Sequence, residues 1–177
     1  VAKHAKAAGV KQFIFMSSQI VFHESQSLKT EVLTSETQEN PNGFYGDSKL
    51  QAELGIKPLE DENFKVWILR PCMIYGSNAK GNFPRLAKLA CKTPIFPCWH
   101  NKRSMLYIDN LAEFVKQAIL RESSGKYYPQ NRELADTVEI IRFFAKAAGH
   151  RIWITRLPNP FVWLGSFVLQ PINKMFA

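Results

Sequence analysis

The sequence has neither the basic runs nor the basic-aromatic stripes that characterise nucleic-acid-binding proteins. Its 23 lysines and arginines against 15 acidic residues give a net charge of +8. The basic residues are scattered, with no five or six in a row, so we expect no nucleic acid among the partners. The charge is compatible with a phosphorylated small substrate.

Cysteine is scarce as well. The three cysteines form no CxxC pair and have no histidine at metal-ligand spacing; they are Cys72, Cys91 and Cys98. We therefore expect no metal site. An odd number of cysteines without a disulfide framework is typical of a reducing compartment, which favours a cytoplasmic location.

A hydrophobic run long enough to cross a membrane is also lacking. The closing stretch "NPFVWLGSFVLQPINKMFA" is apolar with one charge, Lys174, but Pro160 and Pro171 interrupt it at too short an interval for a spanning helix. At the other end, "VAKHAKAAG" is typical of the last turns of a helix with Gly9 as a left-handed cap. We therefore expect no membrane span, and a chain that is part of something larger.

Two short apolar runs indicate buried strands. They are "KQFIFMSS", residues 11–18, and "KVWILRP", residues 65–71, both rich in β-branched and aromatic residues with little alternation. Between them a helical pattern runs from Tyr45 to Lys57 and is ended by Pro58. This order predicts a βαβ unit of a parallel sheet with a right-handed crossover.

The later sequence continues the alternation of helices and strands. We expect a helix over residues 85–92, an apolar turn over 93–104, a short strand over 105–108, and helices over 109–123 and 135–150. The N-caps expected for the last two helices are Asp109 or Asn110, and Thr137. The fold class is therefore α/β.

The stretch "FYGDSKLQAE" places Tyr45 four residues before Lys49, on one face of a helix. An ammonium beside a phenol favours the phenolate, which makes the tyrosine a plausible acid/base catalyst. The alternative is that this loose spacing occurs by chance, with Tyr45 packed on the core and Lys49 solvated.

Two serines, Ser17 and Ser18, follow the first strand. Ligands of open parallel sheets bind beyond the carboxyl ends of the strands, so a hydroxyl here could contact a substrate oxygen. For one of the two serines, we expect instead that the hydroxyl satisfies groups of the neighbouring loop.

Three segments in order, "FIFMSSQIVF", "YGDSKLQAE" and "LRPCMIYG", resemble the extended short-chain dehydrogenase/reductase family, the NAD-dependent nucleotide-sugar epimerases and dehydratases. The resemblance implies that Ser18 is the catalytic hydroxyl, that Tyr45 is the acid/base, and that Lys49 assists the tyrosine and holds the nicotinamide ribose. It also implies that the nicotinamide lies against Pro71, Met73 and Ile74.

The resemblance extends to "KGNFPRLAKLA" and "NKRSMLYIDNLAEF". In the family, these stretches bind the nucleotide diphosphate, which implies contacts from Asn82, Phe83 and Arg103. A guanidinium offers bidentate, charge-assisted bonds to phosphate. From the residue alone, Arg103 would be a solvated turn arginine.

The resemblance implies a Rossmann-like, doubly wound parallel sheet of which only the later strands are present. Residues 1–76 would be the second half of an NAD-binding domain, and residues 77–177 mainly a substrate-binding part, with some segments returning to the sheet. The family's G-x-x-G-x-x-G turn has no counterpart. We therefore expect this chain alone to bind NAD weakly and to expose a strand edge.

The implied function is an NAD-dependent epimerase of a nucleotide sugar, UDP-linked, acting through a transient 4-keto intermediate. NADP as cofactor and a homodimer remain open. The alternatives are a reductase or dehydratase of the same family acting on another substrate, and a non-catalytic relative. Dehydratases need an Asp-Glu pair after the serine, and here Gln19 and Ile20 follow Ser18, which favours an epimerase or a simple reductase.

Overall fold

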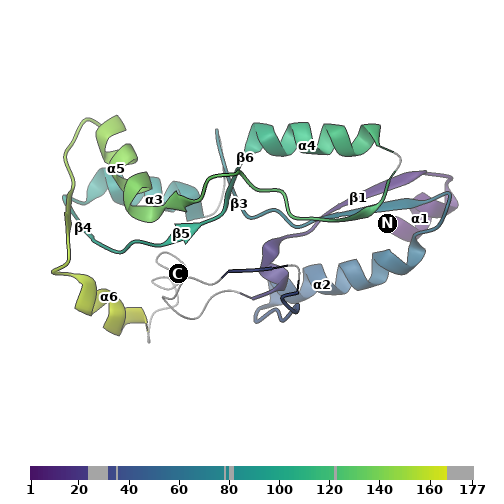
Figure 1. The fold of residues 1–177 in the computed structure, drawn as a ribbon, viewed down its shortest axis with the longest axis horizontal. Coiled ribbons are helices and arrows are strands. Elements are labelled where there is room, and N and C mark those ends of the chain that lie inside the picture. Colours follow the sequence, from purple (N-terminus) through teal and green to yellow (C-terminus); the bar gives the residue numbers. More distant parts are fainter. Residues whose placement is uncertain (24–31, 35, 78, 80–81, 122, 167–177) are drawn as a thin grey trace. The chain divides into compact units, whose positions relative to one another are not determined.

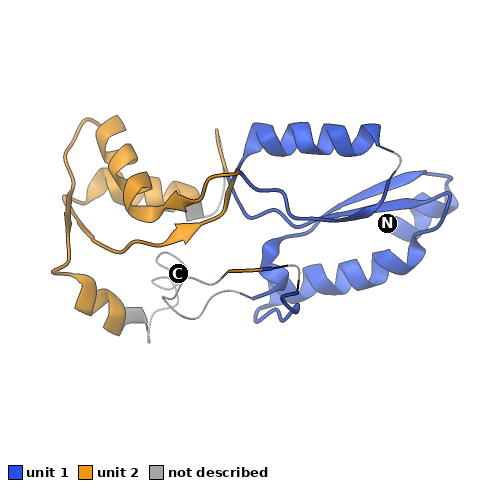
Figure 2. Cartoon of the chain, viewed as in Figure 1, with its two compact units in different colours: residues 1–24, 34–74, 106–131 blue, residues 25–33, 75–105, 132–177 orange. Residues whose placement is uncertain are grey.

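The computed structural model describes residues 1–23, 32–34, 36–77, 79, 82–121 and 123–166. The chain divides into two compact units (Figures 1 and 2). Unit 1 comprises residues 1–24, 34–74 and 106–131, and unit 2 comprises residues 25–33, 75–105 and 132–177.

Unit 1 is built on a parallel sheet of three strands in the order β1-β2-β7. The strands are β1 (Gln12–Met16), β2 (Lys65–Leu69) and β7 (Gly125–Tyr127). Met16 pairs with Leu69, so β1 and β2 end level with one another. The predicted βαβ unit and its parallel sheet are confirmed.

Helices cover both faces of this sheet. They are α1 (Ala2–Ala7), α2 (Phe44–Ile56) and α4 (Ile108–Leu120), together with the short 3-10 helices η1 (Gln19–Val21) and η2 (Lys57–Leu59). Val66 and Ile68 pack towards α1 and the end of α2, whereas Trp67 and Leu69 pack towards α4. Figure 1 accordingly shows α4 on one side of the strands and α2 on the other. Because both faces are covered, β2 is apolar without alternation.

Unit 2 has its own core between two helices. Leu86 and Ala90 of α3 (Asn82–Lys92) pack with Ile141 of α5 (Thr137–Ala147) and with Phe96. Two small ladders border this core. Strand β4 (Ile95–Pro97) pairs in parallel with β9 (Trp153–Thr155), and β5 (Lys102–Arg103) pairs antiparallel with β8 (Ala135–Asp136). The remaining elements are β3 (Met73–Tyr75), which pairs with β6 (Met105–Tyr107), and α6 (Asn159–Ser166).

Several expectations about single elements need correction. Residues 93–104 are not a plain turn, because they contain β4 and β5. Asp109 and Asn110 do not cap α4: its N-cap position is Tyr107, and Asp109 lies in the first turn. The cap of α5 is Asp136 rather than Thr137, because the Asp136 carboxylate accepts the free backbone N–H groups of the first turn. The left-handed Gly9 is confirmed, with φ of 78°.

Among the described residues, no helix is both long and apolar enough to cross a membrane. Within the same part of the chain, no three histidine, cysteine or acidic side chains are grouped so as to hold a metal ion.

Candidate active site

The carboxyl ends of β1 and β2 form one continuous edge. The N–H of Ser17 donates to the carbonyl of Leu69 (2.7 Å), and the N–H of Gln19 donates to the carbonyl of Pro71 (3.1 Å). The pairing of the two strands therefore continues into their loops. It brings Ser17, Ser18 and Pro71 together, as expected for side chains that follow neighbouring parallel strands.

Helix α2 brings Tyr45 and Lys49 to the same edge. The Nζ of Lys49 donates to the carbonyl of Met16, the last residue of β1, at 2.8 Å. The same Nζ lies 5.7 Å from the centre of the Tyr45 ring and 5.1 Å from that of Phe15. Tyr45 is 57% exposed, so it is open to a ligand rather than packed in the core.

The two serines have different surroundings. Ser17 is 3% exposed, and its hydroxyl donates to the carboxylate of Glu53. Ser18 is only half-buried, and its hydroxyl accepts from the N–H of Ile20 at 3.3 Å. A hydroxyl that accepts still has its own hydrogen to donate. The Ser17 hydroxyl is therefore occupied by a partner inside the protein, whereas the Ser18 hydroxyl can still donate its hydrogen to a ligand.

A buried ion-pair network anchors the far end of α2. Arg70, which follows β2, is 0% exposed and binds the Glu53 carboxylate with Nε at 3.0 Å and Nη2 at 2.6 Å. Its Nη2 also donates to Glu39 at 2.8 Å. Burial acts to lower the pKa of Arg70, but its bonds to Glu53 and Glu39 outweigh this effect and raise it above its ordinary value.

Sequence reasoning missed this network, although it left a signal. Glu53 lies two helical turns after Tyr45, and Arg70 interrupts an otherwise apolar strand end. A charged residue at such a position needs a partner, since an unpaired buried charge is very costly.

A glycine sets the distance between α2 and the serine loop. A Cβ on Gly46 would lie 2.7 Å from the carbonyl oxygen of Ile20 and 2.9 Å from the Cβ of Pro41. Only glycine permits this approach. Because Gly46 follows Tyr45 and Ile20 belongs to η1, the contact fixes the start of α2 beside the loop that carries Ser18.

The residues expected to face the nicotinamide follow β2. Pro71 is buried, and Met73 and Ile74 are half-buried in β3. Cys72 lies between them, and its thiol donates to the carbonyl of Pro129 at 3.8 Å. Burial raises the pKa of Cys72 to about 11, so this thiol stays protonated at neutral pH.

The residues expected to bind the diphosphate belong to unit 2. Phe83 lies in the first turn of α3, and its ring packs against those of Tyr75 (5.4 Å) and Phe144 (5.2 Å). Arg103 is half-buried in β5 rather than solvated in a turn, and burial lowers its pKa. Asn82 begins α3, but its side chain lies outside the described residues.

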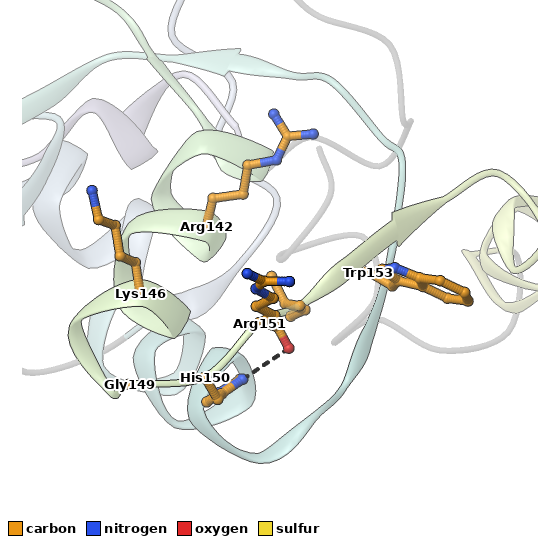
Figure 3. A pocket seen from close by; sticks show the side chains of 7 residues that line it. Arg142, Lys146, Gly149, His150, Arg151 and Trp153 are labelled. Carbon is orange, nitrogen blue, oxygen red and sulfur yellow. Dashed lines mark hydrogen bonds between the residues drawn. The ribbon is translucent and has the colours of Figure 1, made fainter.

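Unit 2 also has a hollow of about 510 Å³ that includes none of the expected site residues. Its basic lining comes from Arg142, Lys146, His150 and Arg151, beside Trp153 (Figure 3). In this view the cationic groups spread apart instead of converging on one point. The hollow therefore lacks the focused donors of a phosphate site.

Comparison with known proteins identifies a matching family and relatives that cover most of the chain. Residues 1–129 match the model of the NAD dependent epimerase/dehydratase family. The chain is 32% identical over 169 residues to UDP-glucose 4-epimerase of Vibrio cholerae, a match that covers 92% of this chain and 50% of the relative. It is 25% identical over 174 residues to N-acetyl-alpha-D-glucosaminyl-diphospho-ditrans,octacis-undecaprenol 4-epimerase of Escherichia coli O157:H7, covering 94% of this chain and 51% of the relative.

Solved structures show the same fold. UDP-glucuronic acid 4-epimerase from Bacillus cereus, in complex with NAD, superimposes with a TM-score of 0.70 at 19% identity, over 99% of this chain and 62% of that one. The expected Rossmann-like α/β class is thus confirmed. The chain spans about half the length of the curated relatives it matches.

Proposed function

Because the chain belongs to the NAD dependent epimerase/dehydratase family, we propose that the complete protein carrying it is an epimerase of a UDP-linked sugar. The observation that carries the proposal is the convergence of Ser18, Tyr45 and Lys49 at the carboxyl edge of β1. Both curated relatives described above are named as sugar 4-epimerases.

Each of the three residues has a chemical task. Tyr45 takes the proton from a sugar hydroxyl and later returns one, which its exposure permits. Ser18 donates its hydroxyl hydrogen to the same sugar oxygen and so positions it. The Nζ of Lys49 lies 5.7 Å from the centre of the Tyr45 ring, where its positive charge stands beside the group that exchanges the proton.

The residues at this edge fit the nicotinamide end of NAD. An ammonium has three hydrogens, and the bond from Lys49 to Met16 uses one of them. The other two can serve ribose hydroxyls, and the half-buried Met73 and Ile74 would give the ring an apolar surface. A nicotinamide held by Lys49, Met73 and Ile74 would supply hydride transfer to and from the sugar.

For the nucleotide diphosphate we assign the start of α3 and Arg103. The first N–H groups of a helix are free and carry partial positive charge, so the backbone of Asn82 and Phe83 suits phosphate oxygens. Arg103 adds a half-buried guanidinium with the geometry for bidentate binding.

Epimerisation is favoured over dehydration by the residue after Ser18. Gln19 supplies no acid or base, and its N–H is used by the carbonyl of Pro71. A dehydratase needs a further acid/base pair beside the serine, because loss of water moves a second proton.

The test is incubation of the complete protein with NAD and either UDP-glucose or UDP-N-acetylglucosamine, followed by NMR of the anomeric proton. We expect a new anomeric signal with the wild type and none with Tyr45→Phe. Parallel reactions with NADP identify the cofactor. UDP-sugar binding without a new signal would overturn the epimerase assignment and favour a net redox reaction. Neither binding nor conversion would favour a reductase of another carbonyl compound.

A further inference from the structure

A second group of reactive side chains lies in unit 2, outside the candidate active site. Cys98 follows β4, His100 lies two residues later, and Asp136 ends β8. The Sγ of Cys98 lies 3.6 Å from Nε2 of His100, and Nδ1 of His100 lies 3.0 Å from Oδ2 of Asp136. The three groups are therefore linked in series, from thiol through imidazole to carboxylate.

The carboxylate determines which nitrogen of His100 carries hydrogen. An ionised carboxylate only accepts, so Nδ1 of His100 must donate to Asp136. In a neutral imidazole the lone pair is then on Nε2, which faces the sulfur of Cys98. This is the arrangement in which an imidazole can take a thiol proton as the sulfur attacks.

The backbone holds both ends of the series in place. Asp136 is 8% exposed, and its Oδ1 caps α5 by accepting from the N–H of Val138 at 2.8 Å. The N–H of Cys98 donates to the carbonyl of Thr155 at 2.8 Å, and its carbonyl accepts from Nδ2 of Asn159 at 2.9 Å. Fixed partners on both sides reduce the entropy lost when the thiol and imidazole align.

We propose that Cys98 is a nucleophilic thiol that reacts with small oxidants of the peroxide class, with His100 as its proton acceptor and Asp136 as a positioning residue. Because Cys98 is half-buried, small reagents should reach its sulfur more easily than large ones. The His100 side chain is 62% exposed, so it can exchange protons with solvent. A thiol is sensitive to oxidation when a neighbouring group can take its proton and when the oxidant can reach the sulfur.

The reaction balances without any further reagent. The sulfur of Cys98 attacks one oxygen of hydrogen peroxide, so an S–O bond forms while the O–O bond breaks. The thiol proton passes to Nε2 of His100 and then to the departing hydroxide, which leaves as water. The sulfur is oxidised by two electrons to a sulfenic acid, and the peroxide is reduced.

The other two cysteines are controls within the same molecule. Cys91 is exposed, and Cys72 is half-buried, with its pKa raised to about 11 by burial. The complete protein is treated with iodoacetamide at pH 7, and the alkylation rate of each cysteine is measured by mass spectrometry. We expect Cys98 to react about tenfold faster than Cys91 despite its lower exposure, and Cys72 to react slowest.

Two variants separate proton transfer from structure. His100→Gln removes the proton acceptor and should lower the Cys98 rate about tenfold, to the level of Cys91. Asp136→Asn keeps the cap of α5, because asparagine caps a helix as well as aspartate does. The amide can donate as well as accept, so it no longer forces Nδ1 of His100 to carry the hydrogen. It should slow Cys98 alone, with the circular dichroism spectrum and the melting temperature unchanged.

The pH dependence of the Cys98 alkylation rate is a further readout. It would not change if His100 and Asp136 only supported the fold. The Cys98 rate is measured against pH in the wild type and in both variants, and loss of the proton acceptor should change this profile while the Cys91 profile stays the same. The other charged side chains on the adjoining elements are the same in every variant. They are Lys102 and Arg103 of β5, Glu139, Arg142 and Lys146 of α5, and Arg156, which follows β9. Differences between the variants therefore report on the His100–Asp136 pair.

Peroxide gives the decisive comparison. We expect a dimedone adduct at Cys98, and not at Cys91, after treatment with hydrogen peroxide. Equal rates at Cys98 and Cys91, an unchanged Cys98 rate in folded His100→Gln, or no adduct at Cys98 would each overturn the proposal.

Discussion

Helix α2 combines tightly held residues with an open one in unit 1. Gly46 is pressed against the backbone of η1, and Glu53 is held by a buried arginine. Lys49 lies one turn before Glu53, and its ammonium binds the end of β1. Tyr45, by contrast, is 57% exposed, so the helix carries an open side chain next to anchored ones.

The difference shows how an exposed tyrosine can be positioned well. Gly46 fixes the backbone next to Tyr45, and Glu53 holds the helix two turns further on. Substitutions of Gly46 or of the arginine that holds Glu53 should therefore cost stability, while Tyr45→Phe should cost activity alone.

The largest effect on stability should follow Arg70→Met. This change leaves the buried carboxylate of Glu53 without its cation, and breaking one side of a buried pair costs about 3–5 kcal/mol. Urea unfolding of the complete protein measures the loss. The matched control is Lys57→Gln, which removes the exposed pair with Glu60 and should cost less than about 1 kcal/mol. Equal losses in the two variants would contradict the anchoring role.

A smaller loss is expected from Gly46→Ala. The added methyl would meet the Ile20 carbonyl, and overpacking of this kind costs about 1–3 kcal/mol. Gly55→Ala in the same helix is the control, because a Cβ there meets nothing within 4 Å. It should stabilise the protein by about 0.5–1 kcal/mol through helix propensity. Similar changes for both glycines in thermal unfolding would contradict the close approach at Gly46.

A still smaller effect should appear in acid. Hydrogen bonds from Lys126 and Arg70 lower the pKa of Glu39 from 4.5 to about 2. A carboxyl whose pKa is lower in the folded state stabilises the protein above pH 4.5, and this contribution disappears as the pH falls towards 2. Since Glu39 is partly exposed, we expect about 1 kcal/mol.

The check is the pH dependence of unfolding in Glu39→Gln. The variant should be less stable than the wild type at pH 6, and the two should approach one another near pH 2. A difference that stays constant over this range would show that the ionisation of Glu39 does not contribute.

The elements around the candidate active site could be predicted because their signals are local. The apolar runs of β1 and β2, and the spacing of Tyr45 and Lys49, are properties of adjacent residues. Adjacent residues alone could not show which of the two serines, Ser17 or Ser18, is free to contact a ligand. Ser17 is occupied because Glu53, far along the chain, reaches it in the folded protein.

Elements defined by distant partners were missed or misread. Strand β7 has only three residues, Gly125–Tyr127, and is recognisable through its pairing with β2. Residues 93–104 have the local pattern of a turn, because the strands that pair with β4 and β5, which are β9 and β8, lie far along the sequence. Thr137 was preferred as a helix cap over its neighbour Asp136, a choice that depends on where the helix begins.

The most direct test of this contrast within α2 is Tyr45→Phe, with its free energy of unfolding and its turnover of the UDP-sugar measured in the same preparation. Removing one exposed hydroxyl should change stability by less than about 0.5 kcal/mol. Loss of the acid/base should lower turnover by about 10²–10⁴-fold. A variant that unfolds as the wild type does but turns over sugar at the wild-type rate would contradict the account.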